Sequence, residues 1–166
     1  MNFGEDSGSS IDFETIRGRD YPTIRQFTVF LENRVGRLLE ILRRFEHTRS
    51  RIVAINIIDS TEYSIVRFVV TYPENGREIL ERAGLAMIEN DLVAIELPPA
   101  NQPLVKVYSA LLQAEVNMTQ TYPLMVRTSD GNMVVALMVD NIELAQQTLA
   151  CEGFRLLSEN DLLEME

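Results

Sequence analysis

The sequence predicts an α+β fold built from two consecutive βαββαβ repeats, each an antiparallel sheet with its helices on one face. Three observations support this fold class. Segments with the apolar patterns of strands alternate along the chain with segments whose apolar residues recur at helical spacing. The order β, α, β, β, α, β occurs twice. The stretch GLAMIENDL, residues 84–92, also recurs as GFRLLSENDL, residues 153–162.

The first predicted repeat begins with a strand and a helix. Residues 23–31 predict a strand because Phe27, Val29 and Leu31 alternate with the residues between them, and this strand ends at Glu32. A helix is predicted over about residues 35–47, where apolar side chains recur at helical spacing.

The remainder of the first repeat follows the same logic. IVAINII, residues 52–58, and SIVRFVVTY, residues 64–72, are rich in β-branched and aromatic residues and predict two strands. ENGREILERAG predicts a second helix that ends at Gly84, and LAMI, residues 85–88, predicts a short fourth strand.

The second repeat is predicted to begin with the strand LVAIEL, residues 92–97, followed by a helix over about residues 104–114. Two strands, at about residues 116–127 and 133–139, are joined through the turn sequence SDGN. Asn141 is a candidate cap for a last helix that stops at Gly153. We therefore expect an N-terminal tail over residues 1–20, one domain over residues 21–91 and another over residues 92–166.

Each predicted sheet has a second face that its own helices do not cover. A right-handed βαβ crossover places both helices of a repeat on one face of the sheet. Yet IVAINII and MVVALMV are apolar at nearly every position, which is typical of strands covered on both faces. An uncovered face would leave an apolar patch on the order of several hundred Å², which monomers seldom tolerate. Either the sibling repeat or a second chain is expected to cover it, and we predict a homodimer.

The charge distribution argues against a nucleic-acid partner. The net charge is −10; residues 1–20 carry five acidic residues and two arginines, residues 21–91 carry ten of each sign, and residues 92–166 carry ten acidic and three basic residues. Nucleic-acid affinity depends largely on basic side chains that neutralise phosphates. All ten basic residues of the middle segment are arginine, so a small anion could still bind locally.

Several other classes of protein and site are not expected. The longest apolar run, Met133 to Val139, is far shorter than the roughly 20 residues that span a bilayer, and the N-terminus lacks a signal-peptide pattern. We therefore expect a cytoplasmic protein with no membrane partner. One cysteine, Cys151, and one histidine, His47, argue against an internal disulfide, a metal site and most catalytic triads. The sequence shows no nucleophile elbow, phosphate loop or dinucleotide fingerprint, so we predict no enzyme activity and no cofactor.

The stretch LENRVGRL, residues 31–38, is the strongest candidate for a binding loop. Gly36 allows a close approach of the backbone to a ligand, and the free N–H groups of the following helix favour an anion. The Asn33 amide can donate and accept hydrogen bonds, while Arg34 or Arg37 could pair bidentately with a carboxylate. An alternative stays open, in which Asn33 is only the helix cap, Gly36 serves packing and the arginines are solvated.

The stretch LENRVGRLLEILRRF, together with the order of elements, resembles the ACT domain, a small ferredoxin-like module that binds effectors in amino-acid metabolism. Glu32, Asn33, Gly36 and Leu38 match the family pattern, with Val35 where proline is common. The resemblance covers about residues 23–166, and tandem copies are similar to the double-ACT proteins of bacteria. It implies that the loop between the first strand and first helix binds an effector, usually an amino acid, against the start of the second strand of a neighbouring domain.

The two copies differ at the positions that the resemblance singles out. In the second copy, PPANQPL replaces the loop, with Gln102 at the position of Gly36. Conversely, Asn117 and Met118 match the family at the start of the second strand, where the first copy has Arg51 and Ile52. This pattern suggests one composite site, in which the loop of the first copy meets the strand start of the second. The predicted effector-binding residues are Glu32, Asn33, Arg34, Val35, Gly36, Arg37, Leu38, Ile52, Asn117 and Met118.

The function predicted from these features is allosteric and non-catalytic regulation by a bound amino acid. One alternative is a regulatory subunit of a biosynthetic enzyme, because FLENRVGRL is similar to the effector loop of acetolactate synthase small subunits. A less favoured alternative is RNA binding, since RNA-recognition motifs share the βαββαβ order; its only support is Phe68 beside Arg67.

Overall fold

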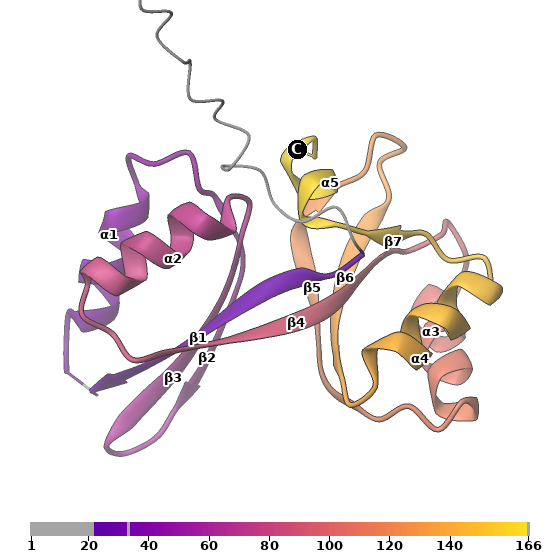
Figure 1. The fold of residues 1–166 in the computed structure, drawn as a ribbon, viewed down its shortest axis with the longest axis horizontal. Helices are drawn as coiled ribbons and strands as arrows, with labels where there is room; N and C mark the ends of the chain where they lie inside the picture. The colour runs from indigo at the N-terminus through magenta and orange to yellow at the C-terminus, as the bar shows by residue number, and fades with distance from the viewer. Residues whose placement is uncertain (1–21, 33, 166) are drawn as a thin grey trace, which may run out of the picture.

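The computed structural model describes residues 22–32 and 34–165 and confirms an α+β fold with βαββαβ repeats (Figure 1). The expected N-terminal tail lies outside the described residues. In chain order the elements are β1 (Ile24–Glu32), α1 (Arg37–Phe45), β2 (Ile52–Asp59), β3 (Tyr63–Val70), α2 (Pro73–Arg82), β4 (Met87–Glu96), α3 (Pro103–Gln113), β5 (Met118–Arg127), β6 (Met133–Val139), α4 (Ile142–Cys151), β7 (Leu156–Leu157) and α5 (Glu159–Leu163). No helix of the described residues is long and apolar enough to span a membrane.

One strand, β4, belongs to the sheets of both repeats. The strand order is β2-β3-β1-β4-β6-β5, with β7 also paired to β4, and every pairing is antiparallel. The first part of β4 pairs with β1, and its last part, from Val93 to Glu96, pairs with β6. The prediction of two separate strands, at residues 85–88 and 92–97, is therefore wrong. The polar residues between them do not end the strand, because Asn90 and Asp91 lie opposite Gln26 and Arg25 in the ladder with β1.

Each repeat packs its own pair of helices against one face of its sheet (Figure 1). In the first repeat, Phe27 and Phe68 of the sheet share a buried cluster with Ile41 of α1 and Leu80 of α2. In the second repeat, an equivalent cluster joins the sheet to α3 and α4 through residues such as Val93, Val135, Leu111 and Leu149. Helices on one face of each antiparallel sheet are thus confirmed.

The helix-free faces of the two sheets pack against each other. Their shared core combines Ile24 and Val69 of the first repeat with Leu124 and Ala136 of the second, all at most 5% exposed. Across the same boundary, the Tyr122 hydroxyl donates a hydrogen bond to the Gln26 side chain. The sibling repeat therefore covers part of these apolar strands, whereas Ile55, Ile57 and Ile58 of β2 stay 41%, 49% and 46% exposed. The homodimer stays a prediction.

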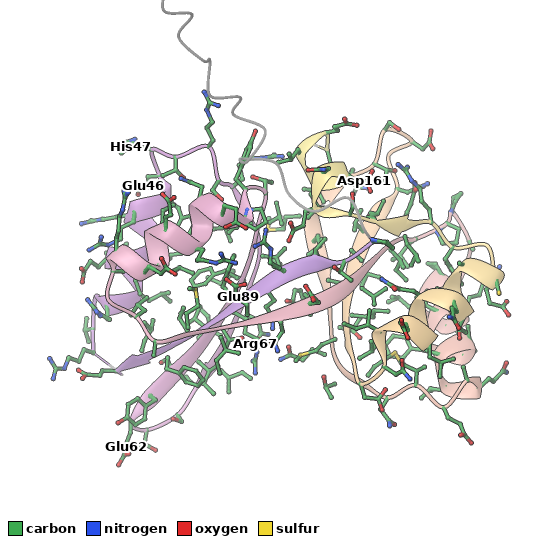
Figure 2. All side chains as sticks on the ribbon, in the orientation of Figure 1. Glu46, His47, Glu62, Arg67, Glu89 and Asp161 are labelled. Atoms are coloured by element: carbon green, nitrogen blue, oxygen red, sulfur yellow. The ribbon has the colours of Figure 1, made fainter. Side chains whose placement is uncertain are left out.

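The C-terminal segment closes one end of this shared core. Ser158 caps α5 through a capping box with Asp161, which is labelled in Figure 2, and Leu162 of α5 is buried in the shared core. On the other side of the sheet, the Glu159 carboxylate receives a bidentate ion pair from Arg25, with N–O distances of 2.6 and 3.0 Å. The C-terminus of the second repeat is thereby anchored on β1 of the first.

Candidate functional site

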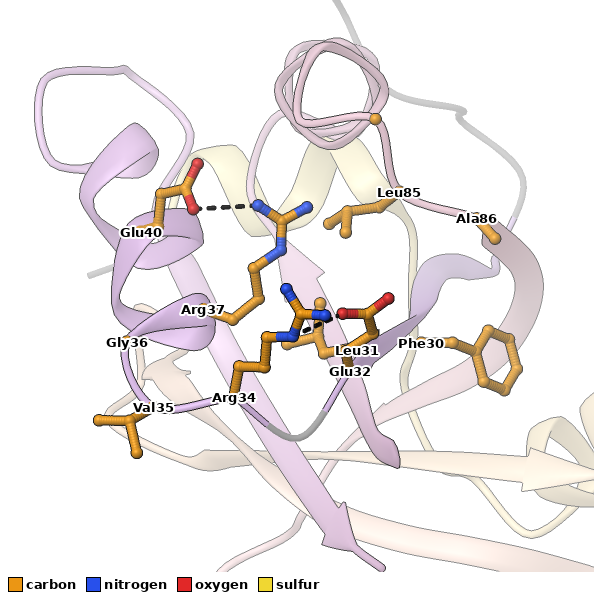
Figure 3. A pocket seen from close by; sticks show the side chains of 11 residues that line it. Phe30, Leu31, Glu32, Arg34, Val35, Gly36, Arg37, Glu40, Leu85 and Ala86 are labelled. Atoms are coloured by element: carbon orange, nitrogen blue, oxygen red, sulfur yellow. Dashed lines mark hydrogen bonds and ion pairs between the residues drawn. The ribbon is translucent and has the colours of Figure 1, made fainter. Parts of the chain in front are cut away.

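A cavity of about 640 Å³ opens where β1 ends and α1 begins (Figure 3). The antiparallel pairing of β1 with β4 brings the start of β4 to the same edge, with Met87 opposite Val29. The cavity therefore has three walls, which are the end of β1, the loop with the first turn of α1, and the segment before β4. It is lined by Phe30, Leu31, Glu32, Arg34, Val35, Gly36, Arg37, Glu40, Gly84, Leu85 and Ala86.

Gly36 is the N-cap of α1 and adopts a left-handed conformation with φ of 88°. A Cβ atom at this position would meet no atom within 4 Å, so a side chain would not clash with its neighbours here. Glycine is favoured instead by the positive φ, because L-residues that carry a side chain rarely adopt this conformation. The loop thus turns sharply into the helix and leaves open space above its first turn.

The first turn of α1 lies beside this space and contains backbone N–H groups that have no acceptor among the described residues. The Arg37 N–H donates to the Arg34 carbonyl at 3.2 Å. Within the described part of the chain, the N–H groups of Leu38 and Leu39 have no hydrogen-bond acceptor, and Gly36 has no side chain with which to cap the helix. Unpaired N–H groups at a helix N-terminus carry partial positive charge and attract anions.

The rim of the cavity carries both signs of charge. Arg34 pairs with Glu32 at 2.9 Å, and Arg37 pairs with Glu40 at 3.0 Å, as the dashed lines in Figure 3 mark. Hydrogen bonds from Arg37 and Arg44 lower the pKa of the Glu40 carboxyl. These ion pairs are largely exposed, so they are weak and can exchange partners with a ligand at small cost.

The opposite wall of the cavity is apolar. Leu85 and Ala86 face the arginines in Figure 3, while Leu31 lies behind them and is 2% exposed. The ring of Phe30 is 40% exposed beside them, and Val35 is fully exposed at the tip of the loop. The cavity therefore combines a charged rim with an apolar wall.

The structure brings together five of the ten predicted site residues. Asn33 lies outside the described residues, whereas Leu38 and Ile52 are partly buried against the core of the first repeat. The residues of the prediction that line the cavity are Glu32, Arg34, Val35, Gly36 and Arg37.

Asn117 and Met118 do not join this cavity. Met118 packs against the core beneath α3 and α4, and the Asn117 amide donates to Asp140 at 2.8 Å. Each half of the predicted composite site lies on the helix-covered side of its own repeat, while the repeats meet through their helix-free faces. The two halves therefore do not meet within one chain, and a composite site stays a prediction for two chains.

A second cavity, of about 440 Å³, lies at the corresponding place in the second repeat. Lys106 lines it one turn into α3, as Glu40 does in α1, and Gly153 to Arg155 correspond to Gly84 to Ala86. Its helix begins differently, because Pro103 in the first turn has no N–H to offer. The second cavity thus lacks the glycine-opened helix start of the first.

Glu96 lines the second cavity and is 8% exposed. Its carboxylate accepts hydrogen bonds from Thr128 Oγ1 at 2.7 Å, Asn132 Nδ2 at 2.8 Å and Arg155 Nη1 at 3.2 Å. The bond from Thr128 is the main cause that lowers the pKa of this carboxyl. Among the described residues, no group of three His, Cys, Asp or Glu side chains could hold a metal ion.

The lining residues that sequence reasoning missed are Phe30, Leu31, Glu40, Gly84, Leu85 and Ala86. Two signals could have identified most of them. Glu40 follows Gly36 by four residues, so it returns to the same side of the helix. In a βαββαβ unit, the first and last strands are antiparallel neighbours, which places the residues before β4 beside the loop after β1.

The aromatic side chain that suggested RNA binding is not available at the surface. Phe68 is 0% exposed and its ring stacks with that of Phe45 at a centroid distance of 6.0 Å. A ring enclosed in the core cannot stack on a base. The RNA-binding interpretation therefore loses the observation on which it rested.

Comparisons with known proteins identify the family. Protein BT0572 from Bacteroides thetaiotaomicron has a similar structure, with a TM-score of 0.75 and 24% sequence identity over 86% of this chain and 97% of that chain. The ligand-free regulatory subunit of aspartate kinase from Thermus thermophilus has a TM-score of 0.52 and 14% identity over 78% of this chain and 92% of that chain. A search of curated proteins finds no match. Residues 22–166 match the family described as the ACT domain pair, and the chain belongs to that family.

Proposed function

We propose that this chain is a non-catalytic, allosteric regulatory protein that binds a free amino acid in the cavity beside Gly36. The observation that carries the proposal is the start of α1, where Gly36 and Arg37 line a cavity with a charged rim and where the N–H groups of Leu38 and Leu39 have no acceptor among the described residues. Its volume of about 640 Å³ falls within the range of roughly 300–1,000 Å³ typical of small-molecule sites.

The chemistry of the cavity is complementary to a zwitterion. A ligand carboxylate would accept hydrogen bonds from the first turn of α1 and a bidentate bond from Arg34 or Arg37. The ligand ammonium would pair with Glu32 or Glu40, whose present arginine partners are exposed. An apolar side chain would lie against Phe30 and Leu85, which favours an apolar amino acid over a charged one.

Regulation requires that the ligand bind two states of the protein with different affinities. The cavity wall formed by Leu85 and Ala86 leads directly into β4. Because β4 continues into the second repeat, a ligand that moves the start of this strand also acts on the sheet of the second repeat. The proposal therefore places the coupling between the repeats in β4.

A thermal-shift screen of the twenty amino acids, followed by calorimetric titration of the hits, tests this function. A ligand at 100 times its dissociation constant is expected to stabilise the protein by about 2.7 kcal/mol. Arg34→Ala and Gly36→Ala should each raise the dissociation constant at least about tenfold, since one removes a cation and the other strains the turn by roughly 1–2 kcal/mol. Arg43→Ala is the matched control, because Arg43 lies on α1 but does not line the cavity.

Two results would contradict the proposal. One is a screen in which no amino acid raises the thermal midpoint; the other is unchanged affinity in both loop variants. Asn117→Ala serves as a further arm of the titration. Since Asn117 is remote from the cavity within one chain, weaker binding in this variant would show that a second copy completes the site.

A second candidate function is that of a regulatory subunit for an amino-acid biosynthetic enzyme such as acetolactate synthase. The similarity of the fold to the regulatory subunit of aspartate kinase favours this candidate. It predicts that a tagged chain purified from its native cells retains a catalytic subunit in stoichiometric amount, which mass spectrometry of the purified material would detect. Recovery of the chain alone would favour a free-standing regulator.

A further inference from the structure

A continuous chain of ion-paired side chains links the C-terminal helix of the second repeat to the first repeat. It begins at Glu159 of α5, whose carboxylate pairs with Arg25 of β1 at 2.6 and 3.0 Å. Arg25 also pairs with Glu74 of α2 at 2.5 Å, and the other oxygen of Glu74 contacts Arg77 at 3.0 Å. Arg77 in turn binds Glu89 of β4, labelled in Figure 2, through two nitrogens. We call these five residues the ion-pair chain.

Helix α2 carries the middle of the ion-pair chain near its start and borders the cavity at its end. Glu74 and Arg77 lie in its first two turns. Just beyond its last residue, the Ala83 carbonyl accepts a long hydrogen bond, of 3.5 Å, from Arg37, which lines the cavity. Leu85 follows in the cavity wall. Arg37 therefore connects the rim of the cavity on α1 to the end of α2.

Helix α5 is an element that can exist in two states. It is five residues long, whereas an isolated helix needs roughly 12–15 residues to be even marginally stable, so α5 is helical only while it is docked. Its docking depends on the bidentate pair with Arg25, on the burial of Leu162, and on a hydrogen bond of 2.7 Å from Arg51 to the Met165 carbonyl. Because Arg25 pairs with α5 and α2 at once, the position of α2 affects how firmly α5 is docked.

We propose that the ion-pair chain couples the cavity beside Gly36 to the docking of α5, so that a ligand bound in this cavity releases the C-terminal helix. The inference rests on the proposed function and describes how that same site is regulated. A ligand carboxylate that pairs with Arg37 withdraws it from the Ala83 carbonyl, which loosens the end of α2.

The burial of the Arg25 guanidinium transmits this change to α5. The side chain is 3% exposed, and a charge in such a position is stable only while its partners are in place. When a shift of α2 moves Glu74 away, the docked state loses one partner of Arg25, whereas release of α5 gives the guanidinium access to water. The balance therefore shifts towards the released state of α5.

Hydrogen exchange of two backbone amides tests this coupling without a ligand. The N–H groups of Glu164 and Met165 donate to carbonyls of α5, so they exchange when this helix opens. Arg37→Ala removes the connection to α2 and should lower the protection of both amides about threefold or more. Amides of β6 report global unfolding, so a loss confined to α5 separates local opening from a general loss of stability.

Arg44→Ala is the matched control. Like Arg37, Arg44 pairs with Glu40 on α1, but among the described residues it has no partner on α2. Glu74→Ala interrupts the ion-pair chain and should by itself lower the protection of the two amides. In the double variant R37A/E74A, the substitution of Arg37 should then have no further effect, because residues that act through one network are not additive.

Two results in these variants overturn the coupling. One is equal protection of the α5 amides in R37A and R44A, and the other is the same loss from R37A with and without Glu74. A third is calorimetric binding of L-leucine, an apolar amino acid, that leaves the protection of these amides unchanged. A screen in which no amino acid binds instead contradicts the proposed function, and the ligand-free variants still decide the coupling.

Discussion

At the scale of single residues, Glu96 shows how a carboxylate is kept charged in a nearly buried position. Burial alone would raise its pKa, but hydrogen bonds from Thr128, Asn132 and Arg155 favour the charged form and lower the pKa below the usual 4.5. A carboxyl group whose pKa is lowered by folding stabilises the protein at pH values above its unfolded pKa. That contribution disappears as the pH falls from about 4.5 through the lower, folded value.

Thr128→Val should raise the pKa of Glu96 towards 4.5, because it removes the hydrogen bond that is the main cause of the shift. The difference in unfolding free energy between pH 7 and strongly acidic pH should shrink accordingly. A carboxyl-carbon NMR titration of Glu96, with urea unfolding at both pH values, measures both effects. Thr119→Val is the control, since Thr119 donates to the Met138 carbonyl and not to a carboxylate. An unchanged titration of Glu96 in Thr128→Val would refute the assignment.

At the scale of elements, the tetrapeptide ENDL forms a strand in one repeat and a helix in the other. Residues 89–92 lie in β4, where their backbone groups pair with β1. Residues 159–162 lie in α5, which Ser158 caps. The preceding residue differs, since β-branched Ile88 favours a strand and Ser158 favours a helix start. The residue before ENDL thus favours a strand or a helix, and pairing with β1 stabilises the strand in the first repeat.

The anchor of α5 should contribute strongly to stability. Arg25 and Glu159 are 3% and 1% exposed, so Glu159→Ala leaves a buried guanidinium that is still paired with the half-exposed Glu74 but has lost its bidentate carboxylate. Breaking a buried pair in this way costs about 3–5 kcal/mol of unfolding free energy. Urea unfolding followed by circular dichroism measures the loss.

Glu78→Ala provides the comparison for this experiment, because the Glu78–Arg82 pair is exposed, with an N–O distance of 3.7 Å. This variant should lose less than about 1 kcal/mol. A loss in Glu159→Ala as small as that in Glu78→Ala would show that the buried ion pair does not anchor the C-terminal helix.

At the scale of the whole molecule, the two repeats share a strand and a core. Because β4 takes part in both sheets and the helix-free faces pack on each other, neither repeat buries its apolar surface alone. We therefore expect the chain to unfold in a single cooperative transition. Hydrogen exchange measured at increasing urea concentration should expose β1 and β3 at the same midpoint as β5 and β6. Two separated midpoints would mean that the repeats unfold independently.

The sequence alone was sufficient to predict the two βαββαβ repeats and the loop at Gly36. Both rest on short-range signals, namely the period of apolar residues and the backbone freedom of glycine. Tertiary structure decided the features that depend on residues distant in the chain. Among them are the continuity of β4, the apolar wall at Leu85, and the placement of Asn117 and Met118 away from the cavity. The reason is that hydrophobic periodicity shows which face of an element is buried, but only pairing and packing determine what lies against that face.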